Sequence, residues 1–179
     1  MEEKLLVKKA KFGDTEAFAN LYEKVYKKMY QFALYTLRSE DDAEDVVSET
    51  VMDAFVSIKS LKKDELFSAW IFQILSNKCK KKMKEYYKKE CSIEETYDNV
   101  KEKNENIGYE NKLSIEDKMD LCKVFSELSP EERLIVGMHI FFGYKTREIA
   151  KVMKLNDSTV RSKESRALKK MAAKIGKEG

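Results

Sequence analysis

The chain has 179 residues, 42% of them hydrophobic and 37% charged, which is enough for the core of one ordinary domain or of two small ones. One proline and six glycines among so many charged residues favour helices over a sheet with tight turns, and we expect an all-α protein. The net charge of +3 is too small to identify a nucleic-acid partner by itself, so the positions of the charges must decide.

The first half of the chain predicts three helices. Apolar residues recur at three- and four-residue steps from Ala17 to Tyr35, which indicates an amphipathic helix. A second helix begins in the acidic "SEDDAEDVV", and a polar connection, "KSLKKDEL", leads to a long third helix that begins at Phe67 and ends in a lysine run. The second helix has an inward apolar stripe of Ala43, Val46, Val47, Thr50, Val51, Ala54 and Phe55.

A polar stretch follows, "CSIEETYDNVKEKNENIGYEN", which is rich in Asn and Glu and has no apolar period. Such a composition is typical of a flexible tether, although a poorly patterned surface helix within a single domain is the alternative. We therefore expect two small helical domains, residues 1–90 and 114–179, joined by a linker over residues 91–113.

The second half carries clear helix starts. Ser114 begins a capping box in "SIED", and in "LSPEER" Ser129 is a cap, Pro130 occupies the first helical position and Glu132 can reach back to the cap. Two further helical patterns, broken by the turn "KLND", predict a helix-turn-helix. The residues expected to point inward are Ile149, Ala150, Met153, Val160, Ala167, Leu168 and Met171.

The last helix presents a basic face. Stepping 100° per residue from a buried Val160 places one set of polar residues outward, namely Arg161, Ser162, Ser165, Arg166 and Lys169. Guanidinium groups suit guanine edges or phosphates, and small hydroxyl groups allow close approach. We interpret this helix as a major-groove reader, and a merely solvated basic face is the alternative.

Two other charged segments stand out. Seven lysines between Lys78 and Lys89, with two tyrosines among them, suit the tracking of a phosphate backbone, although a basic helix end is also favoured by the helix dipole. Between Glu40 and Asp53 there are seven carboxylates and no cation, and Asp42, Asp45, Glu49 and Asp53 project outward. Since such a face repels DNA, we expect it to meet a basic protein surface; a solubility face is the alternative.

Enzymatic and metal chemistry are not expected. Paired carboxylates alone make no active site, and the sequence has no metal motif and no Gly-rich phosphate loop. The three cysteines form no CxxC pair, and the lone His139 has no second ligand at metal spacing. We expect no cofactor, no bound metal and no small-molecule substrate. The N-terminus lacks an apolar leader and no run of about 18 apolar residues occurs, so we expect a soluble, cytoplasmic chain without direct membrane insertion.

The order of these blocks resembles a known family. The aromatic "AFANLYEKVY", the acidic "DDAEDVVSETVMDAF", "FSAWIFQILSNKC", a tether, "LSPEERLIV" and "GYKTREIAKVMKLNDSTVRSKESRALKK" are together similar to the extracytoplasmic-function (ECF) group of bacterial RNA polymerase sigma factors. The resemblance covers roughly residues 17–170. The helix-turn-helix alone is shared with many regulators, whereas the acidic and Trp-bearing blocks in this order are specific.

The resemblance implies partners and residues. The acidic helix would dock on the clamp of the largest subunit of core RNA polymerase through Asp42, Asp45, Val46 and Glu49. The connection "KSLKKDEL" and the next helix would recognise the −10 element of promoter DNA and hold a flipped base, through Asn77, Lys78, Lys81 and Lys82. The helix-turn-helix would read the −35 element through Arg161, Ser162, Ser165, Arg166 and Lys169. Whether an anti-sigma factor is a further partner is left open.

Three departures from the family's pattern affect these expectations. Ser48 stands where Gln is common, which puts one polymerase hydrogen bond in doubt. Lys145 replaces a usual Ser cap, with Thr146 as the substitute, and Glu164 occupies a position that is usually apolar, so we expect the last helix to be rotated or loosely packed there. The rival functions are a free-standing helix-turn-helix transcriptional regulator and a helical adaptor whose basic faces bind other proteins.

Overall fold

The computed structural model describes residues 2–91, 121 and 123–175, and its regular elements are all helices over those residues. The prediction of an all-α fold is therefore confirmed. The predicted linker lies outside the described residues, except for Cys91, which ends a helix. In chain order the elements are α1 (Glu2–Lys11), α2 (Thr15–Leu37), α3 (Glu40–Ser57), the 3-10 turns η1 (Ile58–Ser60) and η2 (Asp64–Leu66), α4 (Phe67–Cys91), α6 (Pro130–Phe142), α7 (Thr146–Met153) and α8 (Asp157–Ile175).

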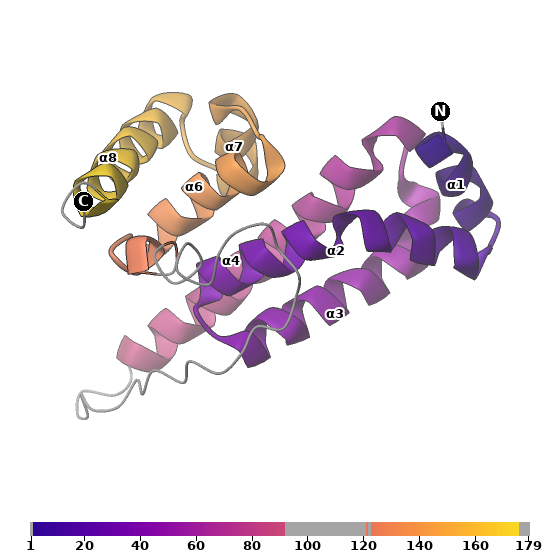
Figure 1. Cartoon of the computed structure of the whole chain (residues 1–179), viewed down its shortest axis with the longest axis horizontal. Coiled ribbons are helices and arrows are strands. Elements are labelled where there is room, and N and C mark those ends of the chain that lie inside the picture. Colours follow the sequence, from indigo (N-terminus) through magenta and orange to yellow (C-terminus); the bar gives the residue numbers. More distant parts are fainter. Residues whose placement is uncertain (1, 92–120, 122, 176–179) are drawn as a thin grey trace.

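Helices α2, α3 and α4 form a long bundle with α1 at one end (Figure 1). Short polar side chains start two of them: the Asp14 carboxylate accepts a hydrogen bond from the Ala17 N–H at 2.9 Å, and the Ser39 hydroxyl accepts one from the Asp42 N–H at 3.2 Å. Between α2 and α3 the chain turns at Arg38, whose φ of 60° is left-handed. Each helix then directs its apolar stripe into a common core.

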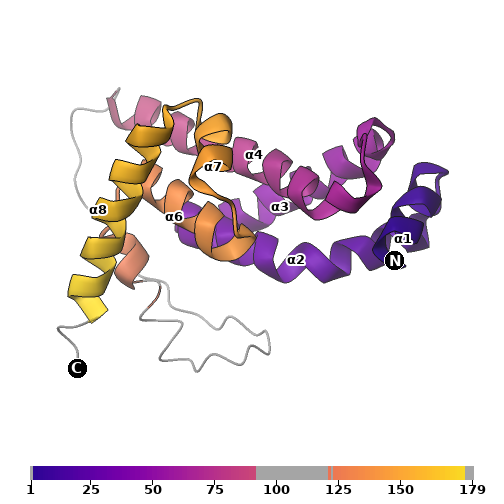
Figure 2. The ribbon, with the colours of Figure 1, turned by 90° about the horizontal axis from the view of Figure 1, so that it is seen from above.

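Helices α6, α7 and α8 group at the end of the bundle opposite α1 (Figures 1 and 2). The predicted capping box is present, because the Ser129 hydroxyl accepts from the Glu132 N–H at 3.3 Å and the Glu132 carboxylate accepts from the Ser129 N–H at 2.8 Å. Helices α7 and α8 form the predicted helix-turn-helix, with Ile149, Met153 and Val160 buried between them. The predicted cap at Ser114 lies outside the described residues.

Two residues of the predicted apolar stripes are more exposed than expected. Leu168 is 45% exposed and Phe55 is 43% exposed, although the Phe55 ring still lies edge-on to Phe18 with centroids 5.1 Å apart. Both residues stand at the border of their stripes, where a rotation of a few tens of degrees moves a side chain out of the core. The inward position predicted for Leu168 is therefore wrong.

The two groups of helices share one continuous core rather than standing apart. Helix α6 lies against α2 and α4, and the Phe142 ring lies 3.9 Å from the Phe72 ring and 4.5 Å from the Phe32 ring, measured between centroids. A smaller cluster closes the other side of α6, where Tyr35 stacks on Phe141 at 5.6 Å. The described helices of the two predicted domains, residues 1–90 and 114–179, therefore pack against each other in this structure.

No helix within residues 2–91 and 123–175 is both long and apolar enough to cross a membrane.

Replacement of Ser129 by Ala tests the helix starts. The change removes the acceptor for the Glu132 N–H, and we expect it to lower the free energy of unfolding by about 1 kcal/mol in urea titrations. Ser48→Ala is the matched control, because Ser48 is exposed within α3, where Ala is the better helix former, and that variant should lose no stability. Equal losses in both variants would contradict the role of the cap.

Candidate functional site

The outer face of α3 is acidic, as predicted. Asp45, Glu49 and Asp53 are exposed and follow one another at four-residue steps, so they lie along one side of the helix. Asp42 lies one turn before this row and is only half-buried. The acidic first turn of α3, Glu40 to Asp42, also places negative charge at the positive end of the helix dipole.

Val46 does not belong to this face. Its side chain is 3% exposed and packs in the core with Val47 and Ala43, because the 100° step that turns Asp45 outward turns Val46 inward. Val46 therefore supports the acidic face from within, and the expectation that it contacts a partner is corrected. Apolar side chains do reach the surface further along the same helix, since Met52 is 69% exposed and Val56 is 81% exposed.

Two of the lysines expected to hold DNA are paired with the acidic helix. Lys78 Nζ lies 2.8 Å from Asp53 and 3.2 Å from Glu49, and Lys82 Nζ lies 2.7 Å from Asp42. Partial burial disfavours the charge of Lys78, but the hydrogen bonds from Asp53 and Glu49 outweigh it and raise the pKa of Lys78. The sequence placed these acidic and basic groups on separate surfaces, whereas the packing of α3 beside α4 brings them together.

Asp42 is held by a small polar network that the sequence did not predict. The Tyr86 hydroxyl donates a hydrogen bond to Asp42, beside the Lys82 ammonium group. Burial alone would raise the pKa of Asp42, but the hydrogen bonds from Lys82, Tyr86 and Ser39 hold it below its ordinary value. The helical spacing of Lys82 and Tyr86, four residues apart on one face of α4, is the only sequence signal for this network.

Asn77 and Lys81 are exposed on a different side of α4, four residues apart. They adjoin Lys80, whose ammonium group donates a hydrogen bond to the Met153 carbonyl oxygen at the end of α7, at 2.8 Å. Helix α4 thus has one lysine face against α3, another against α7 and a third in solvent.

The connection before α4 is fixed from α1, because Lys11 Nζ lies 2.6 Å from both the Leu61 carbonyl oxygen and the Asp64 carboxylate.

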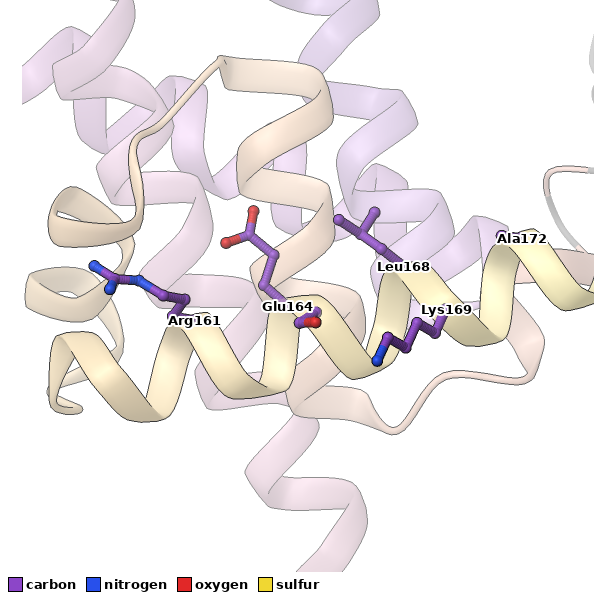
Figure 3. A pocket seen from close by; sticks show the side chains of 6 residues that line it. Arg161, Glu164, Leu168, Lys169 and Ala172 are labelled. Atoms are coloured by element: carbon purple, nitrogen blue, oxygen red, sulfur yellow. The ribbon is translucent and has the colours of Figure 1, made fainter.

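The outer face of α8 carries the residues predicted to read DNA. Arg161, Ser162, Ser165, Arg166 and Lys169 are all exposed. Arg161 is paired with Asp157 at 2.9 Å, and Arg166 Nε donates to the Ser162 carbonyl oxygen at 3.3 Å. A shallow hollow of about 410 Å³ lies on this face, and it is lined by Arg161, Glu164, Ser165, Leu168, Lys169 and Ala172 (Figure 3). An extended basic surface with small hydroxyl groups can meet phosphates and base edges.

Glu164 binds α8 to the two neighbouring helices, α6 and α7, and so serves as an anchor for α8. Its carboxylate lies 3.1 Å from His139 Nδ1 on α6 and accepts a hydrogen bond from the Thr146 hydroxyl on α7 at 3.4 Å. The expected loose packing is not found, since the Glu164 side chain is only 12% exposed. Thr146 is not the substitute cap of α7; the Lys145 N–H instead donates to the Glu148 carboxylate at 2.8 Å.

Two family models match the chain, one in each group of helices. The model described as "Sigma-70 region 2" matches residues 21–88, and "Sigma-70, region 4" matches residues 119–171. The acidic face of α3 and the lysines of α4 fall in the first match, and the helix-turn-helix falls in the second.

Curated relatives carry corresponding names. The RNA polymerase sigma factor SigV of Bacillus subtilis is 26% identical over 83% of this chain and 85% of its own length. The ECF RNA polymerase sigma factor SigM of Mycobacterium tuberculosis is 22% identical over 92% of this chain and 80% of its own. The ECF RNA polymerase sigma factor SigW of B. subtilis is 33% identical, but this chain spans only 46% of its length.

Two solved structures share the fold. One is CnrH in complex with the cytosolic domain of CnrY, at a TM-score of 0.66, 20% identity and full coverage of both chains. The other is the sigma factor RpoE in complex with the anti-sigma factor NepR from Bartonella quintana, at a TM-score of 0.69 and 21% identity, covering 89% of this chain and 96% of that one. At these identities the likeness concerns the arrangement of helices.

Replacement of Asp42 by Asn tests the polar network. The variant loses the ion pair to Lys82, and we expect it to lower the free energy of unfolding by about 1–2 kcal/mol at neutral pH. Because the pKa of Asp42 is lowered in the folded state, its contribution is complete above its ordinary value of 3.8 and disappears as the pH falls through the lowered pKa. The stability difference from wild type should therefore shrink in acid.

The matched control for this variant is Glu44→Gln, an exposed position on the same helix, which should change stability by about 0.5 kcal/mol or less at every pH. A difference between wild type and Asp42→Asn that stays constant down to acidic pH would show that the lost stability does not come from the charge of Asp42.

Proposed function

The chain belongs to the sigma-70 family of RNA polymerase sigma factors, in its ECF group, and we propose that it directs core RNA polymerase to promoters and starts transcription there. The observation that supports this most is the pair of family matches, region 2 followed by region 4, on a chain that keeps an acidic face in the first and a basic helix-turn-helix in the second. A free-standing regulator or a helical adaptor needs no region 2.

We propose that the acidic face of α3 docks on the clamp of the largest polymerase subunit through Asp45 and Glu49. Both carboxylates are exposed, and opposite charge on the partner would accelerate encounter and exclude wrong registers. Met52 and Val56 extend the face with apolar area that gains affinity when it is removed from water. Asp42 contributes through the orientation of α4, since Lys82 and Tyr86 already hold it.

For the −10 element, the proposed surface is the connection 58–66 together with the exposed row of Asn77 and Lys81. Lys11 supports this assignment because its ammonium group binds both Leu61 and Asp64 and so ties the connection to α1. Lys78 and Lys82 join the surface when phosphates replace their carboxylate partners. The exchange costs little at Lys78, because its partners Glu49 and Asp53 are 64% and 59% exposed and such pairs contribute only about 0–1 kcal/mol each. It costs more at Lys82, whose pair with Asp42 is only 29% and 23% exposed.

For the −35 element, the proposed reader is α8, with Arg161, Ser162, Ser165, Arg166 and Lys169 toward the major groove. The anchor at Glu164 supports the assignment, because it fixes α8 on α6 and α7 so that the basic face keeps a defined direction. In this mechanism no covalent bond is made or broken by the chain: contacts to a flipped base and to phosphates offset an unpairing cost of a few kcal/mol per base.

An experiment with purified core polymerase and a library of random promoter templates tests the function as a whole. We expect new start sites that appear only when the chain is added, each with shared sequence near −35 and −10. The unchanged start-site pattern of core polymerase alone would contradict the proposal, and strong binding of the chain to duplex DNA without polymerase would favour the free-standing regulator.

Charge reversal at the acidic face tests docking. The double variant Asp45→Lys and Glu49→Lys should bind immobilised core polymerase at least tenfold more weakly, because attraction becomes repulsion at two contacts. The control is Glu16→Lys with Glu23→Lys, which changes the net charge equally at exposed positions on α2. If both double variants bind equally well, the acidic face of α3 is not the docking surface.

Substitution of Arg166 tests the −35 assignment, on a duplex taken from the selected templates. Arg166→Ala should weaken binding of the polymerase complex by about 1–3 kcal/mol if the guanidinium reads a base. Arg166→Lys separates the two modes of contact, since it retains a phosphate contact but loses a two-pronged base contact. An equal loss on selected and scrambled −35 sequences would identify a phosphate contact instead.

A further inference from the structure

The basic face of α8 contains an ion pair within the helix itself. Arg161 lies one helical turn after Asp157, and its Nη2 donates a hydrogen bond to the Asp157 carboxylate at 2.9 Å. The other two cations of this face, Arg166 and Lys169, have no carboxylate at ion-pair distance among the residues that the structure describes. One cation of the basic face is therefore held by a carboxylate, and the other two are not.

Other lysines of α8 show how structural ion pairs differ from this one. Three of them pair with carboxylates in or just before α6, namely Lys163 with Glu131, Lys170 with Glu132 and Lys174 with Glu127. Those pairs connect α8 to another part of the fold. The pair of Asp157 and Arg161 connects two residues of the same helix, so it fixes the direction of one side chain and attaches α8 to no other element.

The fold alone gives little reason for a carboxylate at this position. The first turn of α8 is closed by the backbone, since the Val160 N–H donates to the Asn156 carbonyl oxygen at 3.1 Å. Asp157 Oδ1 is buried and has no hydrogen-bond partner among the described residues, which costs stability. The ion pair itself is weak in water, because the Arg161 side chain is 71% exposed. The local gain that remains is the attraction of Asp157 to the positive end of the helix dipole.

The pair lies in the part of α8 that would reach furthest into a major groove. The N-terminal residues of a recognition helix contact base edges, and Arg161 lies one turn from the start of α8. Figure 3 shows Arg161 at one end of the hollow on this face, with Lys169 and Ala172 further along the helix. A guanidinium group has several N–H donors in a rigid fork, so a bond to Asp157 leaves donors for O6 and N7 of a guanine.

The carboxylate also changes how Arg161 interacts with phosphates. Asp157 compensates the charge of the guanidinium group at 2.9 Å, and it repels any phosphate that approaches the pair. A compensated cation releases fewer counterions from DNA, so it adds less to binding that is independent of sequence. Specificity is a difference between affinities. A group that lowers binding to every sequence and directs a donor to one base therefore increases specificity.

We propose that Asp157 is a specificity-determining residue of the −35 reader, which directs the Arg161 guanidinium to a base edge and withholds it from phosphates. Because it acts through Arg161, Asp157 is a positioning residue. The effect on the −35 element rests on the function proposed above, whereas the effect on phosphates is a property of the chain by itself. The negative charge thus belongs to the reader as much as the positive charges around it.

The salt dependence of DNA binding tests the effect on phosphates without polymerase. The full chain is titrated with a duplex of random sequence, and Asp157→Asn should bind more tightly at low salt than the wild type. Its log affinity should fall with log salt more steeply by about one unit, because one more cation can meet a phosphate. Glu16→Gln is the control, since it removes the same charge from an exposed position on α2. A slope equal to that of the wild type, or equal steepening in both variants, would overturn the proposal.

Promoter templates with a selected or a scrambled −35 sequence test the effect on specificity. With core polymerase, Asp157→Asn should reduce the ratio of the two affinities by about threefold or more. Asp157→Glu should retain the ratio, because a glutamate also pairs with an arginine four residues later in a helix. In the background of Arg161→Ala, Asp157→Asn should leave the ratio unchanged, since the group through which it acts is absent.

Circular dichroism shows whether the variants keep their helical signal, and Asp157→Ser is a second neutral variant in case Asp157→Asn loses helix. Equal weakening on both templates, or the same change of ratio in the background of Arg161→Ala, would show that Asp157 only supports the start of α8 and would overturn the proposal. If the wild type with polymerase prefers no −35 sequence, the proposed function fails. The salt experiment then still decides whether Asp157 withholds Arg161 from phosphates.

Discussion

Helix α2 is the element on which the structure depends, because its C-terminal half is buried on nearly every side. Met29, Phe32 and Thr36 form one buried stripe, and Tyr30 and Tyr35, which lie on either side of that stripe at 100° per residue, are also at most 9% exposed. A helix buried over more than half of its circumference must be covered from two directions. Helices α3 and α4 cover one side and α6 covers the other. The central position of α2 therefore joins the two family regions into one core.

The same packing explains why opposite charges meet. Helix α3 needs α4 to bury its apolar stripe, and this neighbour carries the lysine run, so Asp42, Glu49 and Asp53 acquire Lys78 and Lys82 as partners. The pairs of Lys78 with Glu49 and Asp53 are weak and are screened by salt because both carboxylates are exposed, whereas the Lys82–Asp42 pair is partly buried. These ion pairs hold the acidic face of α3 beside the lysines of α4 in the free chain. Either face can still exchange its partner for a polymerase side chain or a phosphate.

In the helix-turn-helix, Glu164 departs from the family's pattern but makes polar contacts that stabilise the position of α8. A carboxylate at Glu164 would be costly in an apolar contact, but His139 and Thr146 approach it from two other helices. Together with Glu132, which binds Lys170 at 2.8 Å, it gives α8 polar anchors to the rest of its unit at two places. These anchors restrict rotation of α8 about its axis, so the basic face has a fixed direction even though Leu168 lies outside the core.

The sequence by itself determined helices α2, α3 and α4, the start of α6 at Ser129, the helix-turn-helix and the outward faces of α3 and α8, because these follow from periodicity and local hydrogen bonds within a few residues; it did not predict α1. It also placed Val46 in the apolar stripe, and only the family resemblance moved it to the docking face. The tertiary structure alone decided that Lys78 and Lys82 pair with α3, that Glu164 meets His139, and that Gly137 lies on Phe32. Each of these contacts joins residues far apart in the chain, and periodicity gives the direction of a side chain but not the neighbour that it meets.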